Sequence, residues 1–187
     1  MKIHPIIPDS ALLERAKQGD SSAFRLLVHK HEQQVRSIVL GMLGNTAEAD
    51  DVAQEVFIRF YKSMHEFRGE AALSTYLSRI AINLSLNELK RRETRYNRLS
   101  FFNNQESKIE KEDTGVHPER QDVKEAVHKA LQALEYDFRA VIVLRLLDGY
   151  SVKETAEILN VPQGTVASRL ARAQEKLKAI LIDWEIL

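Results

Sequence analysis

The sequence predicts an all-α protein: two small helical domains joined by a flexible polar linker, the second with a helix-turn-helix. Three observations support this prediction. Apolar residues recur at helical spacing along most of the 187 residues, no segment alternates as a strand would, and helix-capping residues precede the periodic stretches. The periodicity stops over 99–118, so we expect one domain at 1–98, a linker at 99–118 and a second domain at 119–187.

The first domain is expected to open with a short helix over 10–18, followed by a longer one over 20–43. Gly44-Asn45 should break the chain there. Asn45 and Glu48 have the spacing of a capping box, which predicts the start of a third helix that continues to about His65.

A loop at 67–70 leads into a long helix that begins near Leu73 and continues into a basic run at 90–98. Its apolar stripe consists of Leu77, Ile80, Ala81, Leu84 and Leu89. Cations are favourable at any helix C-terminus, so this basic run does not by itself require a ligand.

The segment 99–118 is polar and loses its periodicity after Phe101 and Phe102, which is typical of a flexible linker. Helices are expected to resume after Pro118. One has an apolar stripe of Val127, Ala130, Leu131 and Leu134, and the next contains Phe138, Val141 and Ile142. Gly149 should end the latter helix.

The segment 151–178 predicts a helix-turn-helix. Ser151 and Glu154 form a capping box, the first helix should end at Asn160, and Pro162 suits the first turn of the second. The buried stripe of the second helix is expected to be Val166, Leu170, Ala173 and Leu177. Ser168, Ala171, Arg172 and Glu175 should point away from it. A basic second helix after a tight turn is how many proteins enter the major groove of DNA.

Charge is balanced overall but segregated along the chain. The 27 basic and 27 acidic residues cancel, so net charge alone does not indicate a nucleic-acid partner. Basic residues concentrate in 90–98 and 163–178, whereas 45–57 carries four acidic residues and no cation. Such a chain can present different faces to different partners.

Composition also excludes several kinds of site. The chain has no cysteine, which excludes disulfides, thiolate zinc sites and cysteine nucleophiles. Its first ten residues do not form a signal peptide, and no uncharged apolar run is long enough to cross a bilayer. We therefore expect a cytoplasmic protein with no membrane insertion.

Features typical of enzymes are few. His29 and His31 lie two residues apart and so on different sides of a helix, and we expect both to be solvated. Glu125 and His128 have the spacing of a di-iron motif, but that chemistry needs a second copy and further glutamates. No phosphate-binding glycine loop or nucleophile elbow occurs. The sequence does not favour catalysis, and we expect no cofactor and no metal.

Aromatic residues surround the basic end of the long helix: Phe67, Tyr76, Tyr96, Phe101 and Phe102. Aromatic rings beside cations can stack unpaired bases while the cations neutralise phosphates. Packing in the protein core is an equally good explanation for any one of them, and the sequence leaves both open.

Two stretches together resemble extracytoplasmic-function (ECF) sigma factors of the sigma-70 family, the two-domain promoter-recognition subunits of bacterial RNA polymerase. They are ADDVAQEVFIRFYKSMHEFRGEAALSTYLSRIAINLSLNELKRR at 49–92 and LRLLDGYSVKETAEILNVPQGTVASRLARAQEKLK at 144–178. The resemblance implies a non-enzymatic subunit that binds core polymerase and promoter DNA, with an anti-sigma factor as a possible further partner.

For the first domain, the resemblance implies contacts with polymerase and with the minus-ten element. The residues that would dock on the clamp coiled coil of the largest polymerase subunit are Asp51, Gln54, Glu55 and Arg59. Those that would recognise and melt the minus-ten element are Phe67, Arg68, Tyr76, Arg79, Asn83, Lys90, Arg91 and Arg92. Family members commonly have Trp where this chain has Tyr76, which would stack more weakly.

For the second domain, the resemblance implies recognition of the minus-thirty-five element. Ser168 and Arg172 match positions that face bases. Arg145, Lys153, Thr165, Arg169 and Lys176 complete the expected DNA-binding set. Ala167 and Ala171 stand where larger or basic residues often occur, which implies fewer hydrogen bonds to bases and a larger role for DNA shape.

Two alternatives remain from the sequence. A free-standing regulator could use the helix-turn-helix alone, although this leaves the acidic and basic helices without a role. A helical metal-carboxylate enzyme lacks a full ligand set. The end of the chain, 179–187, is apolar, which favours packing against the core of the protein. A contact with an anti-sigma factor is the alternative hypothesis.

Overall fold

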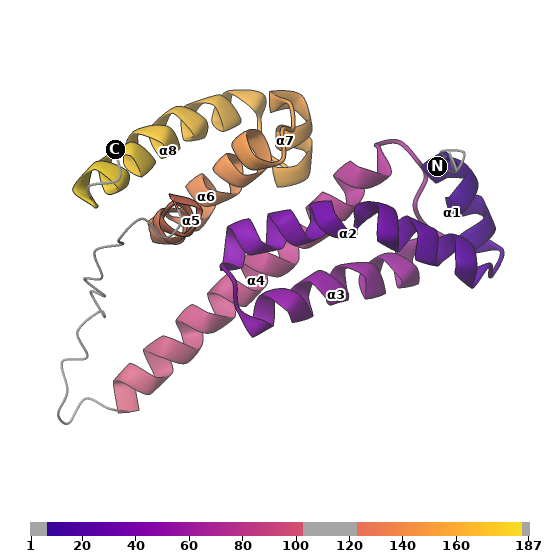
Figure 1. Ribbon diagram of the computed structural model, residues 1–187, viewed down its shortest axis with the longest axis horizontal. Helices are drawn as coiled ribbons and strands as arrows, with labels where there is room; N and C mark the ends of the chain where they lie inside the picture. The colour runs from indigo at the N-terminus through magenta and orange to yellow at the C-terminus, as the bar shows by residue number, and fades with distance from the viewer. Residues whose placement is uncertain (1–6, 103–122, 185–187) are drawn as a thin grey trace.

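The computed structural model describes residues 7–102 and 123–184, and within them the chain is all-α with no strand. This confirms the predicted fold class. The helices before residue 102 form one layered bundle, and those after residue 123 form a second group beside it (Figure 1). No helix of the described residues is long and apolar enough to span a membrane.

The first bundle begins with α1 (Asp9–Lys17) and α2 (Ser21–Leu43). The Asp20 carboxylate accepts hydrogen bonds from the backbone N–H groups of Ser22 and Ala23, and this cap starts α2. Gly44, at a φ of 76°, ends α2, because a residue with a Cβ rarely adopts that backbone conformation. Both predicted helices and the break after them are therefore present.

Helix α3 (Ala47–Ser63) begins one residue later than the capping-box prediction. The cap is Thr46, whose Oγ1 accepts from the N–H of Ala49 at 3.3 Å, so the assignment of the cap to Asn45 was wrong. Threonine and asparagine both cap helices well, and adjacent cap candidates cannot be ranked from sequence spacing alone. The buried side of α3 includes Val56 and Phe60, which lie four residues apart.

Helix α4 (Leu73–Phe102) is the long helix that the stripe predicted, and it extends beyond the end of the bundle (Figure 1). It continues through residues 99–102, which the sequence analysis assigned to the linker. The rest of the predicted linker, including Pro118, lies outside the described residues, and the domain limits stay predictions.

The second group contains α5 (Val123–Ala133), α6 (Tyr136–Ile142), η1 (Val143–Leu147), α7 (Val152–Leu159) and α8 (Gln163–Asp183). The η1 segment is a π-helical turn, in which the N–H of Asp148 donates to the carbonyl of Val143 at 3.0 Å. This turn was not predicted, because a π turn leaves no distinctive residue pattern.

Candidate nucleic-acid interface

Helices α7 and α8 form the predicted helix-turn-helix. Ser151 and Glu154 make both hydrogen bonds of a capping box at the start of α7. Asn160 ends α7 in the left-handed conformation, and Pro162 is the N-cap of α8 rather than a residue of its first turn. The short αL turn between the helices orients α8 across α7, so that one side of α8 is buried and the other is free.

The exposed side of α8 is the one that the periodicity predicted. Val166 and Ala173 are fully buried, whereas Ser168 and Arg172 are exposed. Ser168 Oγ donates to the carbonyl of Thr165 at 3.1 Å, which holds this hydroxyl near the start of the helix. Within the described residues Arg172 forms no ion pair, so its guanidinium is available to a ligand.

Three other cations of the predicted minus-thirty-five set contact acceptors of the protein itself. Arg169 lies 2.5 Å from Asp137, and Lys176 lies 2.6 Å from Glu135 and also stacks over the ring of Phe138. Arg145 Nη1 donates to the carbonyl of Tyr150. The exposed Lys153 on α7 completes the set, together with the half-buried Thr165. Arg169 and Lys176 are thus paired with carboxylates in this conformation, whereas Arg145 donates to a neutral carbonyl.

The predicted minus-ten residues on α4 lie in two different environments. Tyr76 and Phe67 pack against each other, with ring centroids 4.9 Å apart, and Tyr76 Oη lies 3.0 Å from Ser63 Oγ. Both rings are half-buried, so core packing explains them in this conformation. Arg68 and Asn83 are exposed and remain open to a ligand.

Arg79 is exposed on α4 but has a partner on the helix-turn-helix. Its Nη2 donates to the backbone carbonyl of Glu157 on α7 at 2.8 Å. A residue expected to face melted DNA is therefore bound to the other half of the chain.

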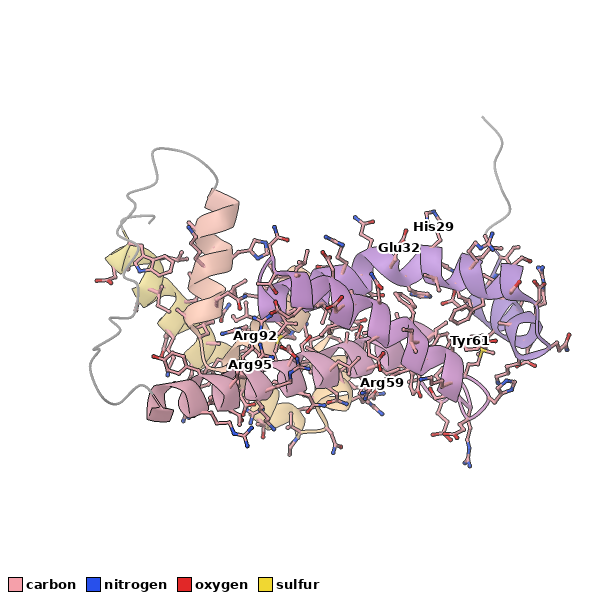
Figure 2. The ribbon with its side chains drawn as sticks, turned by 90° about the horizontal axis from the view of Figure 1, so that it is seen from below. His29, Glu32, Arg59, Tyr61, Arg92 and Arg95 are labelled. Carbon is pink, nitrogen blue, oxygen red and sulfur yellow. The ribbon has the colours of Figure 1, made fainter. Side chains whose placement is uncertain are left out.

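Some side chains of the basic run near the end of α4 are exposed to solvent, and one contacts the rest of the protein. Lys90 and Arg91 are exposed, with Arg91 3.7 Å from Glu88. Arg92 instead turns toward the corner between α2 and α3, where it contacts Leu43 O, Thr46 Oγ1 and Glu48 at 2.8–3.3 Å (Figure 2). Arg92 therefore has a structural role that competes with the predicted contact to DNA. Successive residues of a helix point in different directions, so Arg91 can face solvent while Arg92 faces the protein.

The acidic side of α3 is accessible, as a docking surface requires. Asp51 and Gln54 are exposed, and Glu55 pairs with Arg59 one turn later at 3.0 Å. Arg92 and a backbone N–H both hold the pKa of Glu48 below its ordinary value, the backbone hydrogen bond being the larger cause. Glu48 therefore stays ionised at neutral pH.

The two histidines in the N-terminal half of α2, His29 and His31, do not form a metal site. His29 is exposed and lies 2.8 Å from Glu32 (Figure 2). His31 is only 6% exposed and contacts Asp9 at 3.0 Å, so the expectation that it is solvated was wrong. It lies on the buried stripe of α2, four residues from Leu27. Within the described residues no group of three or more potential ligands could hold a metal ion.

Sequence reasoning missed two buried polar residues that connect the halves of the chain. Arg139 is 3% exposed, and burial lowers its pKa to about 10. Tyr150 is 6% exposed and hydrogen bonds to α2 and α4. The apolar neighbours of Arg139 on both sides, FRAVIV, are the only signal in the sequence that it faces inward.

Family models match both halves of the chain. The model for sigma-70 region 2 matches residues 27–95, and the model for sigma-70 region 4 matches residues 124–177. The chain is 34% identical over 180 residues to the RNA polymerase sigma-H factor of Pseudomonas aeruginosa, covering 92% of this chain and 93% of that protein. It is also 34% identical over 180 residues to the ECF RNA polymerase sigma-E factor of Escherichia coli K12, with 91% and 93% covered.

Two solved structures share the fold. The structure of CnrH in complex with the cytosolic domain of CnrY matches with a TM-score of 0.69 at 24% identity, covering 94% of this chain and 97% of that one. The sigma factor RpoE of Bartonella quintana, solved with the anti-sigma factor NepR, matches with a TM-score of 0.64 at 22% identity, covering 84% and 96%.

Proposed function

The chain belongs to the sigma-70 family as an ECF sigma factor that directs transcription initiation, and from this premise we propose how its surfaces divide the work. Sigma factors are not enzymes: they bind core RNA polymerase and promoter DNA. The assignment of individual residues to these partners is our proposal.

Helix α8 reads the minus-thirty-five element through Ser168 and Arg172. The observation that carries this assignment is the free, exposed face of the second helix of the helix-turn-helix. Lys153 is exposed on α7 and Thr165 is half-buried near the start of α8, while Arg145, Arg169 and Lys176 would have to exchange their intramolecular partners for phosphates. Because each cation must first give up its intramolecular partner, it contributes less to the free energy of DNA binding than an unpaired cation would.

Helix α4 and the loop before it act on the minus-ten element, and α3 docks on polymerase. Arg68, Asn83, Lys90 and Arg91 are exposed for DNA, and Arg79 becomes available once it leaves Glu157. Phe67 and Tyr76 would accept a flipped base only by giving up their tilted contact with each other. The accessible acidic side of α3 faces the clamp coiled coil of the largest polymerase subunit, through Asp51, Gln54, Glu55 and Arg59. Such a protein works where polymerase is, in the cytoplasm.

An anti-sigma factor is a further proposed partner. The solved RpoE structure from Bartonella quintana includes one. The apolar C-terminal end is partly used by the protein itself, because Leu181 is buried, and Ile182 and Trp184 are the apolar side chains that it leaves exposed. Residues 185–187 lie outside the described range.

The test is in vitro transcription with bacterial core polymerase on promoter fragments from the source genome, with and without this protein. New, specific transcripts that need the protein would support the assignment and reveal both promoter elements. Binding of the protein alone to duplex DNA without new transcripts would favour the free-standing regulator instead.

Replacement of Arg172 by Ala tests the base contact. We expect promoter binding to weaken by about 1–3 kcal/mol, with the loss concentrated at one base position of the minus-thirty-five element. Glu175→Ala, one turn along the same exposed side, is the matched control and should leave base preference unchanged. An equal loss on every sequence would make Arg172 a phosphate contact and contradict the assignment.

A further inference from the structure

Helix α4 extends past the bundle to which it belongs. Arg92 contacts the carbonyl of Leu43 at the end of α2 and the hydroxyl of Thr46 at the cap of α3, so the corner between these helices marks the end of the bundle. The residues of α4 beyond that point, 93–102, are called the α4 extension and add about 15 Å of helix (Figure 1). Residues 93–98 are all exposed, so the packing of the bundle does not account for them.

One exposed side of α4 continues into the extension. Between residues 77 and 92, where α4 packs in the bundle, its exposed residues are Arg79, Asn83, Asn87, Lys90 and Arg91. Their spacings of three and four residues place them on one side of the helix. Thr94 and Arg98 repeat these spacings and are exposed as well. The side of α4 that is proposed to bind DNA is therefore the side that carries Thr94 and Arg98.

The α4 extension is positively charged, and its two arginines differ in their surroundings. Arg95 and Arg98 are its cations, and Glu93 is its one acidic residue. A backbone hydrogen bond is the main cause of the low pKa of Glu48, and the charges of Arg92 and Arg95 lower it further, so Arg95 acts on the start of α3. In the part of the chain that the structure describes, the side chain of Arg98 has no ion pair and no hydrogen bond. Arg98 is therefore available to a ligand.

The chemistry and the length of this side of α4 suit the phosphate backbone of DNA. A guanidinium group binds phosphate oxygens through two parallel hydrogen bonds and keeps its charge at physiological pH. Lys90 and Arg98 are eight residues apart on the same side of α4, which is about 12 Å of helix. Phosphates recur about every 3.4 Å along one strand of B-DNA, so this stretch spans roughly three of them.

We propose that the α4 extension binds duplex DNA just upstream of the minus-ten element, through a contact of Arg98 with backbone phosphates. The proposal rests on the proposed function, because it lengthens the surface that acts on the minus-ten element. The chain continues from the end of α4 to the half that reads the minus-thirty-five element, so the end of α4 lies toward the DNA between the two elements. Thr94 makes no such contact, since its hydroxyl already donates to the carbonyl of Lys90 at 2.9 Å.

The salt dependence of DNA binding tests the phosphate contact. Each phosphate that a protein neutralises contributes about 0.9 to the slope of log affinity against log salt on duplex DNA. Arg98→Gln removes the charge and keeps a good helix former at an exposed position. For the free, full-length protein on a duplex of random sequence, we expect this variant to lower the slope by about 0.9. Its affinity should fall about eightfold at 0.1 M salt and only about twofold at 0.5 M, because counterion release contributes nothing near 1 M.

Two further variants separate the charge at this position from charge in general. Arg98→Lys keeps the cation and should retain the wild-type slope. Arg25→Gln removes a cation from an exposed position of α2 and should also leave the slope unchanged. A wild-type slope in Arg98→Gln would overturn the proposal, as would an equal fall in Arg25→Gln.

A photocrosslinker attached to an introduced cysteine locates the contact in the complex with core polymerase and promoter DNA, and the label is specific because the chain has no cysteine of its own. From Arg98→Cys we expect crosslinks to the duplex just upstream of the minus-ten element. Thr94→Cys, one turn earlier on the same side, should crosslink about 6 Å, or roughly two base pairs, closer to that element.

Tyr96→Cys is the matched control for the crosslinks. Tyr96 is 60% exposed, but residues two apart point to opposite sides of a helix, so a label there should not reach DNA. Crosslinks from Arg98→Cys to polymerase alone would overturn the proposal and make the extension a polymerase contact. Equal DNA crosslinking from Tyr96→Cys would overturn it too, because the contact would then not belong to one side of α4.

This proposal and the proposed function fail separately. The salt slope is measured on the free protein with DNA of random sequence, so it tests the Arg98 contact even if no transcript forms. Transcription by the wild type tests the sigma function even if the slope of Arg98→Gln is unchanged. If both hold, Arg98→Gln should initiate at the same promoters as the wild type with a steeper loss of activity in wild-type competition, because a phosphate contact carries no sequence information.

Discussion

Arg139 is a cation placed where solvent hardly reaches. Its guanidinium is held by four carbonyl oxygens, those of the Gln132 side chain and of the Met42, Gln132 and Leu134 backbones. No carboxylate takes part among these bonds. Arginine suits this position because its planar fork directs several donors at once and its charge is hard to remove.

Replacing Arg139 with Met should lower the free energy of unfolding by about 3 kcal/mol, because the carbonyls it serves would be left buried without donors. Methionine keeps the apolar length of the side chain, so lost packing contributes little. Urea unfolding measures the effect. Arg25→Met, at an exposed position of α2, is the control and should change stability by less than about 0.5 kcal/mol. Equal midpoints for the two variants would contradict the role given to Arg139.

Asp148 should make stability depend on pH. Burial raises its pKa to about 6, against a hydrogen bond with Ser37 that lowers it. Because the folded-state pKa lies above the unfolded value of 3.8, its protonated form is favoured by folding. Its contribution is therefore fully present below about pH 4 and is lost as the pH rises through about 6.

The variant Asp148→Asn should accordingly be more stable than the wild type at pH 7.5, by about 1–2 kcal/mol once partial solvent screening is allowed for. The difference should shrink toward zero at pH 4. Urea titrations of both proteins at the two pH values measure it, with Asp183→Asn at an exposed site as the control. A difference that is the same at both pH values would show that ionisation of Asp148 is not its cause.

At the scale of elements, the corner between α2 and α3 depends on a residue from α4. Arg92 reaches the last carbonyl of α2 and the cap of α3, and it lies 3.6 Å from the nearly buried Glu88. The basic run on α4 thus contains both surface cations and one that fixes the position of the neighbouring acidic helix.

Arg92→Ala and Arg91→Ala should therefore have different effects. We expect Arg92→Ala to lower stability by about 1–2 kcal/mol and to weaken core polymerase binding, because α3 loses its support at the N-cap. Arg91→Ala should leave both unchanged and weaken only DNA binding. Thermal unfolding and affinity for core polymerase, measured for both variants, distinguish the two roles. Identical losses in the two variants would contradict a structural role for Arg92 and a DNA-binding role for Arg91.

Much of the local structure could be predicted because it follows from short-range rules. The stripe of α8, the capping box at Ser151 and the end of α7 at Asn160 depend only on residues a few positions apart. The roles of Arg92 and Arg139 depend on the backbone carbonyls of Leu43 and Met42, which are 49 and 97 residues away from them. Carbonyl groups are the same at every residue, so no sequence pattern marks them as partners.

At the scale of the whole molecule, the main surprise is that the two halves of the chain, which the sequence predicts to be separate domains, share a core. The predicted apolar positions Val141 and Ile142 are buried, but Val143 and Leu144, which the prediction did not include, are buried in the same cluster as the core of the first bundle. Hydrophobic periodicity shows that a face is buried without showing against what. The candidate site shows the same limit, since exposure of Arg172 followed from its helix face but the binding of Arg79 to Glu157 did not.

A chain cut between its halves should stay together. We expect that a specific protease site introduced between residues 103 and 122, once cleaved, leaves two fragments that co-elute in size-exclusion chromatography, because their contact includes a common core. The same cut in the Gly41→Ala variant should release separate fragments, because a Cβ at position 41 of α2 would lie only 2.7 Å from Cγ2 of Val143 on η1. Separation of the wild-type fragments at micromolar concentration would show that the contact depends on the covalent link.

The π turn η1 has a consequence for the length of the chain. A π turn holds one more residue than the corresponding stretch of α-helix. Deleting a single residue such as the exposed Leu146 should convert it to a regular helix and leave the residues after it close to their present places. Asp148 and Tyr150 would then still face α2 and α4. The same deletion within the regular helix α6 should instead turn every residue after it by about 100° and break the contact between the halves, so η1 is a place where the chain can lose one residue and keep that contact.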